Sequence, residues 1–300
     1  MPESVTITDN RTGEQIEVPI TNGGVDASAT QVFVINVTPV NDIPSFTSGG
    51  DVTVLEDGVR QDVTYFREAA AALGEERIPL SVVLVLDTSG SMGRNMPFLQ
   101  EAASSFLAKL EQGDRALVVQ FNETVKSSSE FTEDLDRLES FVDALQPWGG
   151  TSLYDAIEYA LMRIRDQAGR KAVVVFSDGE DTTSQTKDDD VVGLARAVEA
   201  TLYTIGIRSD PQFRSSAPRG FLRKIANETG GQYFFPERVG DLIKTFAAIS
   251  AELKAHYLLA YSPQKGPDGL FRTIELKLAR KDVEVRVRKG YFAVKRRPQG

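Results

Sequence analysis

The hydrophobic pattern of this 300-residue chain changes twice along its length. Between about 81 and 250, continuous apolar runs alternate with stretches in which apolar residues recur every three to four positions. Such runs are typical of strands covered on both faces, and the stretches between them are typical of amphipathic helices. This alternation predicts an α/β fold: a doubly wound, mostly parallel sheet with helices on both faces. We expect its strands at 81–86, 115–121, 171–176, 201–207 and 232–235.

Three helical stripes lie between these strands. Two of them span 135–145 and 153–164. The stripe after the first strand places four residues at helical spacing, so the helix there is expected to bury Phe98, Ala102, Phe106 and Leu110.

Both ends of the chain alternate with the period of a strand instead. Short alternating runs separated by turn residues occupy 1 to about 60 and indicate part of a β-sandwich. Residues 251–293 predict an antiparallel extension. We therefore divide the chain into a partial β-sandwich segment, a β lead-in and linker, the α/β domain, and a C-terminal β extension with a basic tail, at 1–50, 51–80, 81–250 and 251–300.

Composition and charge narrow the classes of function. The 34 Lys and Arg against 43 Asp and Glu give a net charge of −9, which argues against a nucleic-acid or anionic-membrane binder. The absence of cysteine excludes disulfides and thiolate metal sites. No apolar run approaches 18 residues, so no membrane span is expected. The first residues lack the basic start and apolar core of a signal peptide. The protein is then intracellular, or its export signal lies outside this chain.

Oxygen-bearing side chains gather where the buried strands are expected to end. Asp87, Ser89 and Ser91 follow the first strand, Thr151 precedes a helix, and Asp178 follows the third strand. Parallel strands end at one edge of a sheet, where two carboxylates repel unless a cation neutralises them. Hard oxygen donors suit Mg²⁺, Mn²⁺ or Ca²⁺ better than Zn²⁺. The five residues therefore predict a divalent-cation site, and ordinary turn and capping chemistry is the alternative.

Five neighbours are secondary candidates around or at the rim of this site. Gly90 and Gly150 lie in the same loops, where glycine lets backbone approach closely. Asp155 is either a supporting acceptor or an acid favoured by the helix dipole. Trp148 is either an exposed contact or packing beside the glycines. Glu180 either tunes the metal or lies in a solvated loop.

Residues 29–46 resemble the end of a bacterial cadherin-like or Ig-like tandem repeat, which closes on a Val-Thr-Pro-Val-Asn-Asp-x-Pro phrase. Such repeats stack into extracellular stalks. The resemblance makes Asp42 a candidate Ca²⁺ ligand, with an Asx-turn before proline as the alternative. The end of one repeat lacks the strands needed to bury a face, which argues against an independent fold for residues 1–50.

Residues 51–293 resemble a bacterial von Willebrand factor type A domain with a metal-ion-dependent adhesion site. Phrases at 56–61, 222–236, 257–263 and 288–292 carry the resemblance, together with the site pattern Asp-x-Ser-x-Ser, then Thr, then Asp. The matching residues are Asp87, Ser89, Ser91, Thr151 and Asp178. The resemblance implies a binding module, not an enzyme, whose cation takes an Asp or Glu carboxylate from a protein partner.

The leading hypothesis is therefore a metal-dependent, adhesion-type protein-binding module using Mg²⁺, or Mn²⁺ or Ca²⁺, on a bacterial cell surface. An intracellular scaffold that assembles complexes with an ATPase is an alternative, and it keeps a cytoplasmic location open. A metal-assisted phosphatase is a further alternative. No nucleophile elbow or phosphate-binding glycine loop favours a serine hydrolase or a nucleotide enzyme, and His256 is the single histidine.

Overall fold

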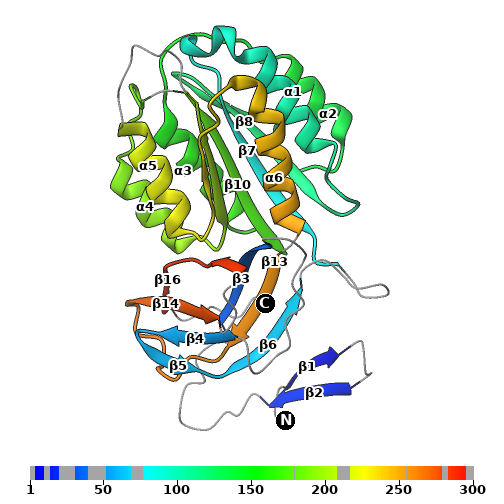
Figure 1. Ribbon diagram of the computed structural model, residues 1–300, viewed down its shortest axis with the longest axis vertical. Helices are drawn as coiled ribbons and strands as arrows, with labels where there is room; N and C mark the ends of the chain where they lie inside the picture. Colours follow the sequence, from blue (N-terminus) through cyan, green and yellow to red (C-terminus); the bar gives the residue numbers. More distant parts are fainter. Residues whose placement is uncertain are drawn as a thin grey trace.

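Six strands form the central sheet of the upper body, in the order β12-β11-β10-β7-β8-β9 (Figure 1). All neighbours are parallel except β8 and β9. The computed structural model describes residues 4–9, 14–19, 31–39, 52–68, 77–178, 180–207, 217–254, 256–278 and 283–294. The strands are β7 (Leu80–Asp87), β8 (Arg115–Phe121), β9 (Val125–Ser127), β10 (Arg170–Ser177), β11 (Thr201–Gly206) and β12 (Tyr233–Phe234).

Helices cover both faces of this sheet, as the sequence predicts. One face packs on α1 (Met96–Leu107), α2 (Leu135–Asp143) and α6 (Leu242–Lys254). The other packs on α3 (Leu153–Ile164), α4 (Asp188–Ala197) and α5 (Ala217–Glu228). Alternate residues of β7 point into the two cores, which explains the continuous apolar run at 82–86. The predicted fold class is confirmed. Two short 3₁₀ helices, η1 (Gly90–Arg94) and η2 (Val239–Asp241), precede α1 and α6.

The predicted buried face of α1 is wrong at Phe98, and Leu110 lies beyond the end of the helix, half-buried against the same core. Ala102 and Phe106 are buried, but Phe98 is 44% exposed. Met96 and Leu99 take the inward positions of the first turn instead. The helix begins at Met96, so its core-facing stripe is rotated from the stripe that starts at Phe98.

A second body lies below the first and contains two four-stranded sheets, ordered β15-β3-β13-β6 and β16-β14-β4-β5 (Figure 1). The predicted C-terminal strands are present and antiparallel. A separate hairpin joins β1 and β2. The bounds are β1 (Ser4–Asp9), β2 (Glu14–Pro19), β3 (Gln31–Pro39), β4 (Val52–Glu56), β5 (Val59–Gln61), β6 (Val63–Glu68), β13 (His256–Tyr261), β14 (Phe271–Leu278), β15 (Val283–Arg286) and β16 (Gly290–Phe292).

Strands from the two ends of the chain share these sheets. β3 lies between β13 and β15, and β14 pairs with β4. Strand pairs therefore join segments on opposite sides of the predicted boundaries at residues 50, 80 and 250. The division of the chain into domains at these boundaries stays a prediction. Asp42 and the turn around it lie outside the described residues.

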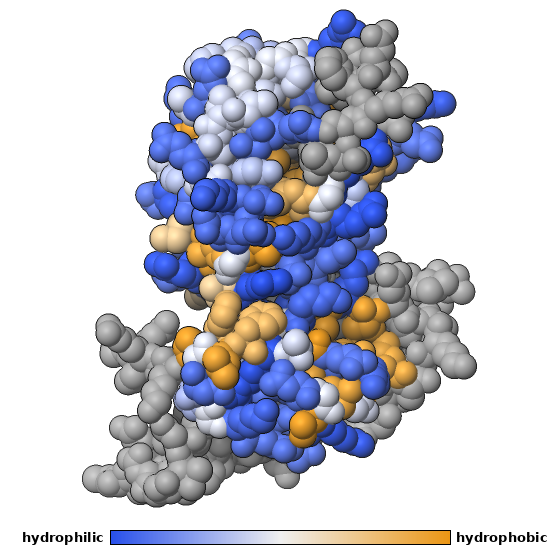
Figure 2. All heavy atoms as spheres, turned by 90° about the vertical axis from the view of Figure 1, so that its left-hand side faces the viewer, coloured by the Kyte–Doolittle hydropathy of each residue, from blue (hydrophilic) through white to orange (hydrophobic). Residues whose placement is uncertain are grey.

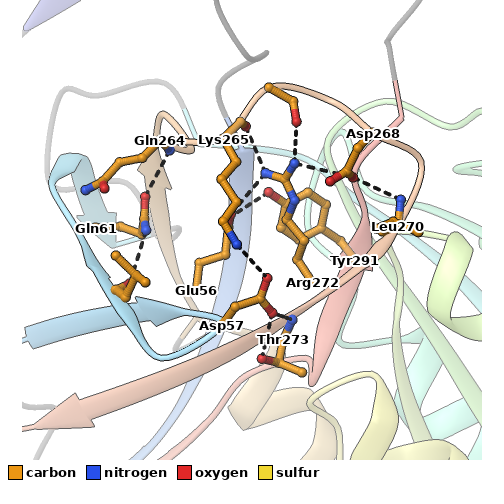
Figure 3. Close-up of polar contacts among 12 residues, drawn as sticks. Glu56, Asp57, Gln61, Gln264, Lys265, Asp268, Leu270, Arg272, Thr273 and Tyr291 are labelled. Carbon is orange, nitrogen blue, oxygen red and sulfur yellow. Dashed lines mark hydrogen bonds and ion pairs between the residues drawn. The ribbon is translucent and has the colours of Figure 1, made fainter.

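A buried polar cluster joins four of these strand segments, and Figure 3 shows its members Glu56, Arg272 and Tyr291. The Glu56 carboxylate is 3% exposed and accepts hydrogen bonds from Arg272 Nη1 at 3.0 Å, Tyr261 Oη at 2.7 Å and Tyr291 Oη at 2.8 Å. Arg272, 2% exposed, also donates to the Lys265 carbonyl at 2.9 Å. One carboxylate thus joins residues more than 200 positions apart.

Polar contacts also join the two bodies. Glu252 of α6 accepts a hydrogen bond from Tyr203 of β11 at 2.7 Å and pairs with Arg286 of β15. The Lys289 N–H donates to the Glu228 carbonyl at 3.1 Å. The lower body is therefore held against the end of the parallel sheet opposite to the carboxyl ends of its strands. Among the described helices, none is long and apolar enough to cross a membrane.

We expect Gly231→Ala to destabilise the protein by about 2 kcal/mol or more. A Cβ at this position would lie 1.9 Å from the Leu202 carbonyl oxygen of β11, and backbone cannot yield as a flexible side chain can. Gly193→Ala is the control, because its Cβ would meet nothing within 4 Å in α4. Its helix propensity predicts a gain of about 0.5–1 kcal/mol. Urea unfolding of both variants measures the difference, and equal stabilities would contradict the close approach.

Candidate metal centre

The two candidate carboxylates come from neighbouring parallel strands. Asp87 is the last residue of β7, and Asp178 directly follows β10. Leu86 pairs with Phe176, so the two strands end level with each other. Ser89 directly precedes η1, and Ser91 lies in this short helix between β7 and α1. The sheet thus delivers both carboxylates and both serines to one edge, as expected for parallel strands.

Hydrogen bonds connect four of the five predicted residues. Ser91 Oγ donates to Asp178 Oδ1 at 2.8 Å, and the hydroxyl oxygens of Ser89 and Ser91 lie 3.0 Å apart. The Ser89 N–H donates to Asp87 Oδ1 at 2.8 Å. Ser177 Oγ donates to the other oxygen, Asp87 Oδ2, at 2.6 Å. The carboxylates therefore share one network of hydroxyl and backbone donors.

Thr151 is placed beside this network by its backbone. The Trp148 N–H donates to the Thr88 carbonyl at 2.9 Å, and the Gly90 N–H donates to the Gly149 carbonyl at 3.0 Å. These two bonds join the loop before Thr151 to the loop that carries Ser89 and Ser91. The Thr151 residue itself is buried.

Thr182 fixes Thr151 from the other side. The Thr151 N–H donates to Thr182 Oγ1 at 2.9 Å, and the Thr182 N–H donates back to the Thr151 carbonyl at 2.8 Å. Because Thr182 follows Asp178 by four residues, this pair of bonds joins the second and third loops of the candidate site.

The glycines of the second loop are required by the space around them. Gly149 has a φ of +73°, which side chains other than glycine rarely adopt. A Cβ on Gly150 would lie 2.9 Å from Thr183 Cγ2, and the Gly150 N–H donates to Glu123 Oε1 at 3.0 Å. A Cβ on Gly90 would lie 3.4 Å from the Gly149 carbonyl oxygen. The positive φ explains Gly149, and the Thr183 side chain beside the backbone explains Gly150.

The other secondary candidates lie around this loop cluster. Asp155, in the first turn of α3, accepts hydrogen bonds from the backbone of Gln185 at 3.1 Å and Thr186 at 2.9 Å. It therefore fastens the third loop to the helix. The Trp148 side chain is 49% exposed, although the N–H of this residue is bonded to the Thr88 carbonyl. Glu180 is also exposed.

Burial raises the pKa values of both carboxyl groups, and repulsion from Asp87 adds to the shift at Asp178. Desolvation raises the pKa of Asp87, and the hydrogen bonds from Ser177 and Ser89 oppose it. Desolvation, then the charge of Asp87, raises the pKa of Asp178 to about 7. Asp87 is fully buried and Asp178 is 7% exposed. Two carboxylates at this depth need a positive partner in order to ionise together without a large cost.

The chemistry of the donors fits a hard divalent cation. Two carboxylates and three hydroxyls offer oxygen only, which suits Mg²⁺, Mn²⁺ or Ca²⁺. In the described ranges, no group of three or more His, Cys, Asp or Glu side chains gathers to hold a metal. A soft or borderline cation such as Zn²⁺ would find no nitrogen or sulfur ligand here, since His256 lies on β13 in the other body.

Three residues near the site were missed from the sequence. They are Ser177, which bonds Asp87, Thr182, which holds Thr151, and Glu123, which holds Gly150. Ser177 carries a detectable signal, because it directly precedes Asp178 at the end of an apolar strand. Glu123 and Thr182 act on loops distant in the sequence, and no spacing rule links them.

Comparison with known proteins gives one family and several distant neighbours. The von Willebrand factor type A domain model matches residues 81–248. The pig inter-alpha-trypsin inhibitor heavy chain H4 is 25% identical over 250 residues, covering 77% of this chain and 26% of that protein. The chain thus spans about a quarter of the length of this curated relative.

Two solved structures show the same fold. A von Willebrand factor type A protein from Catenulispora acidiphila has a TM-score of 0.52 at 14% identity, covering 93% of this chain and 78% of that one. The corresponding domain of the type V pili tip protein Mfa5 from Porphyromonas gingivalis has a TM-score of 0.50 at 15% identity. It covers 60% of this chain and 96% of that one.

Proposed function

The chain belongs to the von Willebrand factor type A domain family, and on that premise we propose that it is a metal-dependent protein-binding module of the adhesion type. In this proposal a divalent cation, Mg²⁺ first and Mn²⁺ or Ca²⁺ next, bridges the chain to an Asp or Glu carboxylate of a partner protein. The residues that would hold the cation are Asp87, Ser89, Ser91, Thr151 and Asp178.

One observation carries the proposal. Two buried carboxylates, Asp87 and Asp178, end adjacent parallel strands and share hydrogen bonds with two serine hydroxyls at the same sheet edge. Their raised pKa values show that the arrangement disfavours two negative charges in the absence of a cation. When bound, the cation supplies the positive charge that both carboxylates need and an attraction for a further carboxylate.

Each residue then has a separate task in binding. Asp87 and Asp178 provide the charge, and Ser89, Ser91 and Thr151 provide neutral oxygens. The two carboxylates balance the charge of a divalent cation, and the neutral hydroxyls add no further negative charge. A carboxylate from outside can therefore still join the coordination shell without strong repulsion. We propose binding and not hydrolysis, because the proposal assigns both carboxylates to the cation, which leaves neither of them to act as a general base.

Two secondary candidates keep roles in the proposal. Trp148 is exposed next to backbone that is bonded to the first loop, so it is a candidate contact for the partner. Asp155 supports the third loop through Gln185 and Thr186. We further propose a bacterial cell-surface location. The likeness to a pili tip protein of Porphyromonas gingivalis supports it, as does the sequence resemblance at 29–46.

The test begins with the metal itself. We expect Mg²⁺ or Mn²⁺ to bind the purified protein and to raise its melting temperature, because a ligand at about 100 times its Kd adds about 2.7 kcal/mol to stability. Asp87→Ala should abolish both effects. Glu101→Ala, which removes an exposed carboxylate of α1, is the matched control and should bind Mg²⁺ like the wild type. Calorimetric titration and thermal unfolding with Mg²⁺ or EDTA make the measurement.

Partner binding is tested with the same set of proteins. The immobilised chain should capture a partner protein that supplies an Asp or Glu carboxylate when Mg²⁺ is present, and it should fail to do so with EDTA. Asp87→Ala should fail to capture it in either buffer. Normal capture by Asp87→Ala in the presence of Mg²⁺ would refute the proposed function, whatever the partner is.

A further inference from the structure

Two arginines on α5 stack on two aromatic rings at the edge of the parallel sheet. Arg219 and Arg223 are one helical turn apart and share a face. The Arg219 guanidinium carbon lies 3.5 Å from the centre of the Phe235 ring, and that of Arg223 lies 5.6 Å from the centre of the Tyr233 ring. The two rings stack with centroids 6.2 Å apart and planes 29° apart. Two cations are thus held side by side on an aromatic support.

These two cations are not used within the described part of the chain. No ion pair or hydrogen bond of the described residues involves the guanidinium of Arg219 or Arg223, whereas Lys224 on the same helix pairs with Asp189 at 3.0 Å. Like charges one turn apart destabilise a helix. Arg223 is exposed and Arg219 is half-buried, so their N–H groups are available to a ligand. The side of the molecule that carries α4 and α5 has a mostly hydrophilic surface over the upper body (Figure 2).

The strand register places this surface level with the candidate metal centre. Phe234 pairs with Ile205, Ile205 with Phe176, and Phe176 with Leu86, which directly precedes Asp87. β12 lies two strands from β10, or about 10 Å at the usual strand spacing, and about 14 Å from β7. The arginine pair and the metal centre therefore lie along one edge of one sheet.

The chemistry of the pair selects carboxylates. A guanidinium stacked on a ring keeps its N–H groups in its own plane, where they can bind a carboxylate with two hydrogen bonds. Burial raises the pKa of Tyr233 although the two arginines oppose it, so the phenol stays neutral and leaves the positive charge unopposed. An anionic ligand at this place therefore meets two positive charges beside a neutral phenol.

We propose that Arg219 and Arg223 form a second contact site for an acidic segment of the protein partner, beside the carboxylate taken by the cation. This inference rests on the proposed function and adds a feature of the partner. An extended strand advances about 3.3 Å per residue, so acidic residues three to five positions apart can reach both places. The partner is thus an acidic polypeptide segment with at least two spaced carboxylates.

Two fluorescein-labelled serine peptides test the proposal in the presence of Mg²⁺. One carries two acidic residues four positions apart, and the other carries only one. Fluorescence anisotropy should show that the wild type binds the two-acid peptide at least about fivefold more tightly. Arg219→Gln with Arg223→Gln should remove this preference. Lys126→Gln with Arg60→Gln, which removes the same charge from exposed positions on β9 and β5, should keep it.

The variants separate this inference from the proposed function. Asp87→Ala or EDTA should weaken both peptides, and a failure there would refute the metal centre while leaving the arginine preference measurable. The inference is overturned if the wild type binds both peptides equally or binds neither. It is also overturned if the double Gln variant, shown to be folded by its melting curve, keeps the preference. Heparin binding is measured on the same proteins. If the double Gln variant loses heparin binding but keeps its peptide preference, the surface is assigned to sulfated glycans and the inference is overturned.

Discussion

Glu56→Ala is expected to lower the free energy of unfolding by about 3–5 kcal/mol, because it removes the buried counter-charge of Arg272 and leaves the 44% exposed Asp268, at 3.5 Å, as its ion-pair partner. Both side chains are almost fully buried, at 3% and 2% exposed. The same substitution removes the acceptor of two phenols, Tyr261 and Tyr291, whose pKa values are raised by burial and by their hydrogen bonds to Glu56. These phenols are protonated donors and would lose their partner inside the lower body; Figure 3 shows Tyr291 beside Glu56.

This loss should be large relative to the total stability of the lower body, because the apolar core of that body is small. Only seven buried apolar residues make up the described core cluster, among them Val54, Leu259 and Ile274. Glu56→Gln keeps an acceptor for the tyrosines but removes the charge, so we expect a loss between that of Glu56→Ala and the wild type. Glu275→Gln is the control, since the Glu275–Lys277 pair is about 60% exposed and contributes less than about 1 kcal/mol.

Guanidinium-induced unfolding followed by far-UV circular dichroism measures these differences. Tryptophan fluorescence adds a local probe, since Trp148 is the single tryptophan and lies in the upper body. We expect the far-UV transition of Glu56→Ala to move to lower denaturant concentration than the fluorescence transition, which would show that the lower body fails first. A stability of Glu56→Ala within about 0.5 kcal/mol of the wild type would contradict a structural role for the cluster.

The parallel sheet is predictable from the sequence because its strands are continuous apolar runs. β8 has the bounds that its run predicts, and β7 and β10 exceed theirs by one residue at each end. The face of α1 is less predictable. An apolar residue at helical spacing, such as Phe98, can face solvent when the first turn starts elsewhere, and periodicity does not fix where the helix begins.

The pairing of strands in the lower body is far less predictable, because the paired strands are distant in the chain. Alternation shows that β3 and β13 are strands, but it carries no information on which strand lies beside which. Val34 pairs with Leu258 across more than 200 residues. The same distance hides the link between Glu56 and Arg272, each of which is an ordinary charged residue of a strand when taken alone.

The candidate metal centre falls between these two cases. Its loops follow strands whose parallel order brings their ends together, so Asp87 and Asp178 could be placed at one edge from the sequence. The bonds that hold the loops are a different matter. Glu123 supports Gly150, and Thr182 supports Thr151, through backbone groups that no residue pattern marks. Residue type indicates donors, while their positioning depends on contacts between loops.

Asp178→Asn is expected to stabilise the metal-free protein and to destabilise the Mg²⁺-loaded protein relative to wild type. Without metal, the substitution removes one of two buried carboxylates, and the amide oxygen can still accept the hydrogen bond from Ser91. The pKa of Asp178, raised to about 7 by burial and by Asp87, indicates a gain of about 1–3 kcal/mol at mildly alkaline pH. With Mg²⁺, the wild type gains binding energy that the variant cannot match.

The order of the two melting temperatures should therefore reverse between EDTA and saturating Mg²⁺. This reversal distinguishes a metal ligand from a residue that only supports the loops, whose loss would lower stability in both conditions. Glu101→Gln removes the same charge from an exposed position of α1. Its melting temperature should keep the same order relative to the wild type in EDTA and in Mg²⁺. If Asp178→Asn is less stable than the wild type in EDTA, repulsion between the carboxylates does not govern the site. If Mg²⁺ stabilises both proteins equally, Asp178 is not a ligand.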